Sequence, residues 1–145
     1  MCTMARILIL CTGNSCRSKM AQAVLQHTDN NLIVCSAGTQ PAKEVNPLAV
    51  RVMDEVNMPI TDLKTHDVSE YENQDWDYVI TVCDHARETC PVFSGNVAHR
   101  LHLGFTDPAM AKGSEEEKLS VFRKVRNEII NSFNTFYRQI SKKDF

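Results

Sequence analysis

The sequence predicts an α/β fold in which a four-stranded parallel sheet is flanked by helices, in three layers. Short apolar segments alternate along the chain with segments of helical periodicity, which is the pattern of strands joined by helical crossovers. The first segment, residues 5–10, is apolar apart from Arg6, as expected of a strand buried in a parallel sheet. With 145 residues, of which 43% are hydrophobic and 23% charged, the chain suits one domain spanning residues 1–145.

Three further strands are expected from short apolar or alternating runs. Residues 32–35 form the second strand and lead into a Ser-Ala-Gly turn. Residues 78–82 are rich in β-branched side chains and form the third. Residues 97–103 alternate between apolar and polar side chains and form the fourth, with a glycine after it.

Three helices follow from apolar spacing and from their start signals. Residues 18–27 place their apolar side chains on one face. The helix over residues 46–56 starts with Asn46 as N-cap and a proline in its first turn. The long helix over residues 114–140 begins with a serine and three glutamates, where the helix dipole favours negative charge.

Composition excludes several classes of protein. A net charge of −2 gives no reason to expect nucleic acid or a membrane surface as partner. There is no apolar run of the roughly 20 residues that cross a bilayer, and the N-terminus does not resemble a signal peptide. We therefore expect a cytoplasmic monomer, in which cysteines are catalytic, metal-binding or buried rather than cross-linked. The six cysteines are Cys2, Cys11, Cys16, Cys35, Cys83 and Cys90.

The segment between the first strand and the first helix reads Cys-Thr-Gly-Asn-Ser-Cys-Arg-Ser, residues 11–18. Backbone N–H groups in such a loop can converge on one tetrahedral oxyanion, and the helix dipole favours its charge. The same field stabilises Cys11 as a nucleophilic thiolate, and Arg17 can bind two oxygens of the ion. Gly13 is expected to supply a backbone angle that a side chain would forbid. The residues expected to bind the oxyanion are Thr12, Gly13, Asn14, Ser15, Cys16, Arg17 and Ser18. The alternative is an ordinary buried cysteine beside an ion-paired arginine.

Two further reactive side chains directly follow strands. Cys83 follows the third strand and Asp107 follows the fourth. Since the carboxyl ends of parallel strands meet at one edge of the sheet, both are expected near the loop. Asp107 is positioned there to protonate a leaving oxygen. The alternative is a turn-forming aspartate before a proline, which is a common arrangement.

Cys83 and Cys90 are separated by seven positions. On a helix that is two turns, about 10.5 Å along the axis, whereas a disulfide needs Cα atoms within about 7 Å. A bridge between them requires the segment to unwind, which suits a mobile redox relay. The alternatives are two unrelated cysteines, or a metal site that includes His85 but has no evident fourth ligand.

These motifs together resemble those of thioredoxin-coupled arsenate reductases built on the low-molecular-weight protein tyrosine phosphatase fold. The resemblance covers nearly the whole chain. Its matching segments are residues 11–18, 36–38, 45–47, 82–91, 104–109 and 122–129.

The resemblance implies a relay of three cysteines that reduces arsenate to arsenite. Cys11 would attack arsenic while Asp107 protonates the departing oxygen. Cys83 would then attack Cys11, releasing arsenite, and Cys90 would move the disulfide to the Cys83–Cys90 pair. Thioredoxin, or in the alternative glutaredoxin, would reduce that pair, and no bound cofactor is implied.

Two other functions remain open. One is a low-molecular-weight protein tyrosine phosphatase that hydrolyses phosphate monoesters through a phosphocysteine at Cys11. Phosphatases of this fold usually carry aromatic residues after the Asp-Pro pair, whereas Ala109 and Met110 stand here. The other is a phosphate-binding or partner-binding module without catalysis, which the intact set of nucleophile, arginine and acid disfavours.

Departures from the family pattern concern a cation and the spare cysteines. Gln22 stands where some members carry a glutamate that helps to hold potassium near the loop. The chain therefore offers at most a weak cation site at the matching positions, Asn14, Ser36 and Asp67, and no other metal site is expected. Cys16 and Cys35 are expected to serve packing, and neither Cys2 nor Cys35 has an assigned role.

Overall fold

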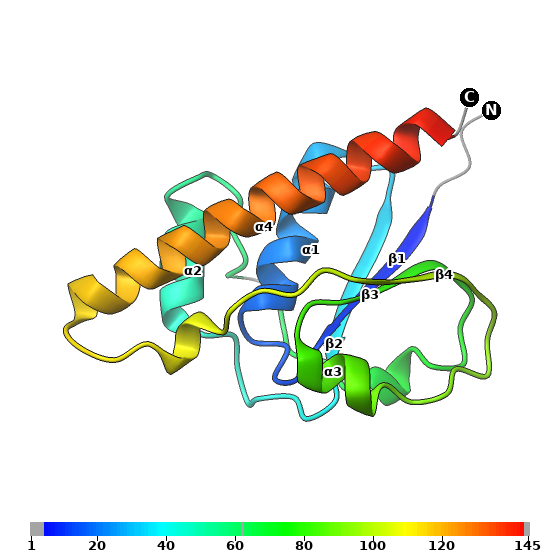
Figure 1. Ribbon diagram of the computed structural model, residues 1–145, viewed down its shortest axis with the longest axis horizontal. Coiled ribbons are helices and arrows are strands. Elements are labelled where there is room, and N and C mark those ends of the chain that lie inside the picture. Colours follow the sequence, from blue (N-terminus) through cyan, green and yellow to red (C-terminus); the bar gives the residue numbers. More distant parts are fainter. Residues whose placement is uncertain (1–4, 62, 144–145) are drawn as a thin grey trace.

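A computed structural model describes residues 5–61 and 63–143 of the protein; Cys2 lies outside the described residues. Four parallel strands form one sheet in the order β2-β1-β3-β4. This confirms the predicted parallel sheet flanked by helices (Figure 1). The strands are β1 (Arg6–Cys11), β2 (Ile33–Gly38), β3 (Trp76–Thr81) and β4 (Val97–His102).

The three expected helices form, and a short helix and two 3-10 turns join them. Asn46 caps α2 as predicted, because its side-chain oxygen accepts a hydrogen bond from Leu48 N at 2.9 Å. In the described part of the chain, no helix combines the length and the apolar character needed to span a membrane. The helices are α1 (Arg17–Thr28), α2 (Pro47–Asp54), α3 (Asp84–Thr89) and α4 (Glu115–Lys143), with 3-10 turns η1 (Val68–Glu70) and η2 (Pro108–Met110).

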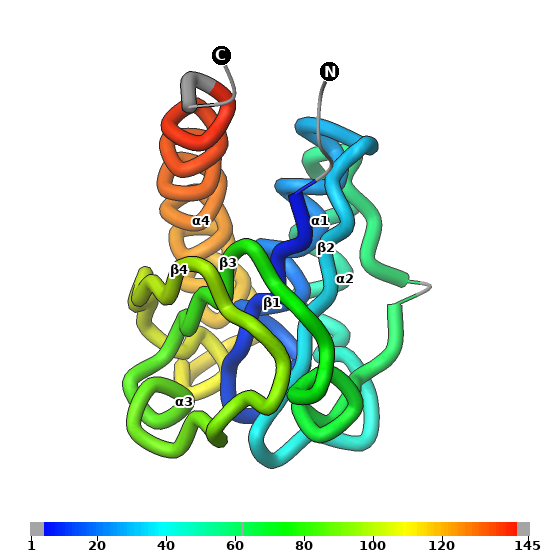
Figure 2. The backbone as a smooth tube through the Cα atoms, turned by 90° about the vertical axis from the view of Figure 1, so that its right-hand side faces the viewer, coloured from blue at the N-terminus to red at the C-terminus, as the bar shows by residue number. Residues whose placement is uncertain are grey.

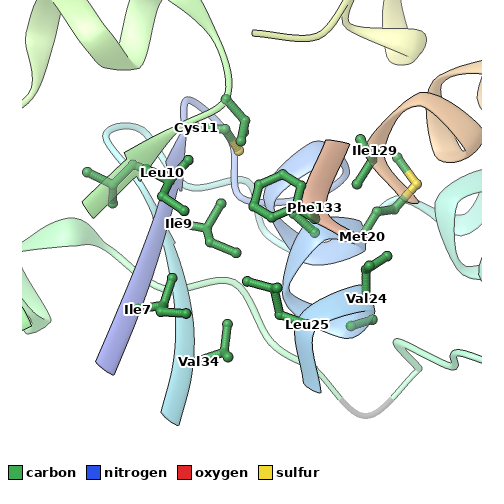
Figure 3. Close-up of a cluster of buried hydrophobic side chains, with 14 of the residues drawn as sticks. Ile7, Ile9, Leu10, Cys11, Met20, Val24, Leu25, Val34, Ile129 and Phe133 are labelled. Carbon is green, nitrogen blue, oxygen red and sulfur yellow. The ribbon is translucent and has the colours of Figure 1, made fainter. Parts of the chain in front are cut away.

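The core forms where α1 and α4 pack together and α1 packs on the central strand β1. Ile7 and Ile9 of β1 are completely buried and face Leu25 of α1 and Phe133 of α4 (Figure 3). This burial fixes the strand that leads directly into Cys11, since a side chain of this size contributes about 1.5–3 kcal/mol on burial. A buried strand and the helix packed on it therefore hold the loop between them.

The carboxyl ends of the strands lie at one end of the molecule. The loop after β1 and helix α3 after β3 both lie at this end, the lower one in Figures 1 and 2. Strand β4 is an edge strand whose side chains are largely exposed. The reactive residues that follow β1, β3 and β4 are thus brought to the same edge, as the sequence predicts.

Glu55, directly after α2, ties this helix to α4. Its carboxylate accepts hydrogen bonds from Arg123 Nη2 and Arg126 Nη1, both at 2.8 Å. The hydrogen bonds from Arg123 contribute most to lowering the pKa of Glu55, to about 2. Since the folded state lowers this pKa, the pair stabilises the fold above the ordinary pKa of about 4.5 and loses that effect as pH falls toward 2.

We therefore expect Glu55→Gln to lower the melting temperature at pH 7, with the difference from wild type shrinking steadily between pH 4.5 and pH 2. Thermal unfolding followed by circular dichroism across this range measures it. The exposed Glu44→Gln is the matched control and is expected to leave the melting temperature unchanged. A difference for Glu55→Gln that stays constant down to pH 2 would contradict the ion-pair explanation.

Candidate active site

The loop between β1 and α1 turns its carbonyl groups toward the segment that follows β2. Because each peptide is trans, the N–H groups of the same peptides, including those of Gly13, Asn14 and Cys16, point to the opposite side. On that side, at the N-terminus of α1, these N–H groups can converge on an oxyanion. The hydrogen bonds run from Thr39 N to Cys11 O (3.1 Å), Gln40 N to Thr12 O (2.9 Å), Ala42 N to Gly13 O (2.9 Å) and Asn46 N to Ser15 O (2.8 Å).

Cys11 lies at the end of β1 and is 2% exposed. Its sulfur accepts a hydrogen bond from Asn14 N at 3.1 Å and lies 2.9 Å from Ser18 Oγ. Asn14 Nδ2 donates to Ser18 Oγ at 2.8 Å, so the Ser18 hydroxyl proton is available to the sulfur. Two donors and the N-terminus of α1 thus face one sulfur, which is the position expected of a nucleophile beside a bound oxyanion.

The backbone strain of the loop lies at Asn14 rather than at Gly13. Asn14 has φ +52°, and its side-chain oxygen accepts a hydrogen bond from His66 N at 2.8 Å. Gly13 does not adopt the left-handed conformation, and a Cβ there would meet Ser15 Oγ at 3.4 Å, an ordinary contact. The expectation that Gly13 supplies a forbidden backbone angle is therefore wrong; asparagine, which tolerates positive φ, takes that place.

Gly38, at the end of β2, is the glycine on which the loop depends. A Cβ there would lie 2.4 Å from Thr12 O and 3.1 Å from Asn14 N, so the loop backbone would have to move. We expect Gly38→Ala to destabilise the protein by about 1–3 kcal/mol and to weaken oxyanion binding.

Urea unfolding and the rise in melting temperature caused by added phosphate measure these two effects. Gly13→Ala is the matched control, because Gly13 lies in the loop that Gly38 approaches and has space for a methyl group. Equal effects of the two substitutions would show that the close approach at Gly38 does not shape the loop.

Arg17 and Asp107, 90 residues apart in sequence, lie together as predicted. Arg17 Nη1 donates to Phe105 O at 3.1 Å, and Nη2 lies 3.6 Å from Asp107 Oδ2. Asp107 Oδ1 accepts from Ala109 N at 3.0 Å, which fixes the carboxyl at the start of η2. An arginine and an acid therefore stand at the helix N-terminus where the loop would hold an oxyanion.

Cys83 is placed beside the loop. It is 5% exposed, and its sulfur lies 3.4 Å from Thr12 Oγ1 and accepts from Ala86 N at 3.4 Å, capping α3. From the sequence, Thr12 is expected only to bind the oxyanion. Its contact with the Cys83 sulfur is seen only in the structure.

Cys90 lies at the opposite end of α3 and is half-buried. Burial raises the pKa of its thiol, and the nearby Arg100 opposes that rise. No group of three His, Cys, Asp or Glu side chains suited to a metal ion occurs among residues 5–61 and 63–143, which disfavours the metal site with His85. The six-residue helix between the two sulfurs is the element that would have to unwind for them to meet.

The remaining described cysteines fit packing roles. Cys16 is 4% exposed, and burial strongly raises the pKa of its thiol. Burial also raises the pKa of Cys35, which is half-buried on β2. Both thiols therefore stay protonated near neutral pH, unlike a nucleophile.

Each residue of the expected weak cation site already makes a side-chain hydrogen bond. Asn14 Oδ1 accepts from His66 N, Asp67 Oδ1 accepts from Ser69 N at 2.9 Å, and Ser36 Oγ donates to Gln22 Oε1 at 2.6 Å. The neutral Gln22 adds no charge to this group. The site stays a prediction, and no step of the chemistry below depends on a cation.

Comparison with known proteins identifies the family. Residues 6–144 match the family described as low molecular weight phosphotyrosine protein phosphatase. Arsenate reductase from Halalkalibacterium halodurans is 43% identical over 131 residues, which cover 90% of this chain and 93% of the relative. A solved structure of an arsenate reductase in the oxidized state has a TM-score of 0.80 at 23% identity and covers 94% of this chain and 99% of that chain, a likeness of fold.

A thioredoxin-dependent arsenate reductase of Corynebacterium glutamicum, Cg_ArsC1', has a TM-score of 0.71 at 25% identity, covering 97% of this chain and 63% of that chain. The family match and the identity to the Halalkalibacterium relative each extend over most of the sequence. The protein therefore belongs to the low molecular weight phosphotyrosine protein phosphatase family, in the group that contains these arsenate reductases.

Proposed function

We propose that this protein reduces arsenate to arsenite through Cys11, Cys83 and Cys90, with thioredoxin as the external reductant. One observation carries the proposal: the Cys83 sulfur lies 3.4 Å from Thr12 of the oxyanion loop, residues 11–18, and Cys83 and Cys90 are the two caps of helix α3. A phosphatase of this fold needs a nucleophile, an arginine and an acid, but it needs no second thiol at the loop. The arsenate reductases among its relatives support the choice of substrate.

In the first step the Cys11 thiolate attacks arsenic(V), forming a sulfur–arsenic bond. The N–H groups of the loop and Arg17 hold the remaining oxygens, and Asp107 donates a proton to the oxygen that departs as water. The Cys83 thiolate then attacks the Cys11 sulfur. The new disulfide forms, the sulfur–arsenic bond breaks, and its electron pair stays on arsenic, which leaves as arsenite, arsenic(III).

The Cys90 thiolate next attacks Cys83, displaces the Cys11 thiolate and leaves a Cys83–Cys90 disulfide. This step requires α3 to unwind, because about 9 Å of helix separates its two ends. Helix α3 is short and its side chains are mostly exposed, so little free energy opposes the change. The disulfide is thereby moved away from the buried loop to a place where thioredoxin, a dithiol protein, can reduce it.

Cys90→Ser separates the first turnover from recycling. We expect this variant, previously reduced and freed of thiols, to release one arsenite per molecule and then to stop, even with thioredoxin, thioredoxin reductase and NADPH. We expect wild type to release one arsenite per molecule without reductant and many with it. Cys35→Ser is the matched control and is expected to behave like wild type, because Cys35 is outside the relay. Continued turnover by Cys90→Ser would contradict the role of Cys90.

Hydrolysis of phosphate monoesters by Cys11, Arg17 and Asp107 is the alternative. It would need the same loop, but Met110 is 73% exposed where an aromatic residue would cover a phenol ring. Rapid hydrolysis of an aryl phosphate, without arsenite release from arsenate, would favour the phosphatase.

A further inference from the structure

Helix α1 buries a lysine that the chemistry above does not use. Lys19 is 1% exposed and is among the largest fully buried side chains. Within residues 5–61 and 63–143 it makes no hydrogen bond and no salt bridge. Arg126, by contrast, is a buried cation that donates to Glu55 and to Val52 O. A buried ammonium is costly unless an opposite charge compensates it, so Lys19 needs a counter-charge.

Lys19 lies on helix α1 between the oxyanion loop and strand β2. It directly follows Ser18, which contacts the Cys11 sulfur. One turn later Gln22 donates to Val34 O at 3.2 Å and accepts from Ser36 Oγ, so this face of α1 lies against β2. Long side chains on a helix point back toward its N-terminus, which here is the loop.

Three titratable groups act on Lys19: Cys11 in the loop, Cys35 on β2 and Glu70 in η1. Burial lowers the pKa of Lys19 to about 8, and these groups oppose that shift, Cys11 most strongly. The lysine is therefore mostly protonated at pH 7.

Two of the three groups do not serve as its counter-charge. Burial raises the pKa of Cys35, so that thiol is neutral near pH 7. The Glu70 carboxylate is exposed and already accepts from Asp67 N at 3.0 Å and contacts His66 Nδ1 at 3.2 Å. The Arg17 guanidinium has Asp107 as its partner. The group that remains for Lys19 is Cys11, the strongest of the three that oppose the lowered pKa of the lysine.

We propose that Lys19 is a positioning residue whose buried ammonium is the counter-charge that holds Cys11 as a thiolate before an oxyanion binds. The proposal rests on the proposed function only for the role of Cys11 as nucleophile. Lys19 acts on the reaction through the Cys11 sulfur, so it is a positioning residue and not a catalytic one.

The rate of alkylation of Cys11 by iodoacetamide, measured from pH 5 to pH 9 with peptide mass spectrometry to assign the modified cysteine, tests this. In Lys19→Met we expect the rate at pH 6 to fall about tenfold and the half-maximal rate to move to higher pH, with the same plateau in alkali. Methionine has a similar volume, and an apolar replacement of a buried charge often folds well. The exposed Lys43→Met removes the same charge and is expected to match wild type.

A folded Lys19→Met protein with the wild-type alkylation profile would overturn the proposal. A second measurement needs no variant at Lys19. If the Lys19 ammonium stabilises the Cys11 thiolate, the thiolate stabilises the ammonium equally, so Cys11→Ser should lower the pKa of Lys19 further. NMR titration of the lysine side chains measures this, and an unchanged Lys19 would also overturn the proposal. Neither experiment uses arsenate, so failure of wild type to reduce arsenate would remove the proposed function and leave the role of Lys19 standing.

Discussion

Replacing Cys83 with serine is expected to lower arsenite production by at least about a thousandfold, because the hydroxyl cannot form the disulfide that drives arsenic from Cys11. The sulfur lies 3.4 Å from Thr12 Oγ1 and is buried. Cys16, which lies near Cys11, does not replace it, because burial raises the pKa of the Cys16 thiol and keeps it protonated. The fold should be kept, since serine can also cap α3 through Ala86 N. Arsenite is measured by chromatography coupled to mass spectrometry, with thioredoxin as the sole reductant.

The controls for this variant separate loss of the relay from loss of the loop. Cys35→Ser should keep full activity, and Cys83→Ser should still be stabilised against heat by phosphate, because the oxyanion loop is unchanged. Small thiols must be absent, since they would substitute for the missing sulfur. If Cys83→Ser released arsenite at the wild-type rate, the relay would have to be abandoned.

Much of the architecture could be predicted from the sequence because it depends on local patterns. Apolar runs identify the strands, and the N-cap of Asn46 identifies α2. The meeting of Arg17 with Asp107 follows from topology alone, since both lie after parallel strands of one sheet. Cys83 is placed beside the loop for the same reason.

The errors and omissions arise where distant segments touch. The sequence placed the backbone constraint at Gly13, but the neighbour that matters is Gly38, from another strand, and the positive φ lies at Asn14. Lys19 was also missed, because its helix does not reveal that β2 covers this face. Helical periodicity reports which side chains are apolar, whereas the burial of a lone cation depends on long-range packing.

Arg17→Lys is expected to lower kcat/KM for arsenate by about 10²–10³, although the charge is kept. Arg17 is 12% exposed and uses its two terminal nitrogens separately, Nη1 on Phe105 O at 3.1 Å and Nη2 near Asp107 at 3.6 Å. A lysine ammonium is a single point of charge. It cannot hold the carbonyl, approach the acid and bind two oxygens of arsenate in the same plane.

The pattern of kinetic change distinguishes this explanation from simple unfolding. Loss of transition-state contacts should lower kcat more than it raises KM, whereas the melting temperature should fall only by the effect of about one hydrogen bond. Arg87→Lys, on the exposed face of α3, is the matched control and should leave kcat in the first turnover unchanged. If Arg17→Lys instead retained most of its kcat in single-turnover arsenite release, then the forked geometry would be unnecessary, and the N–H groups of the loop alone would carry the stabilisation of the oxyanion.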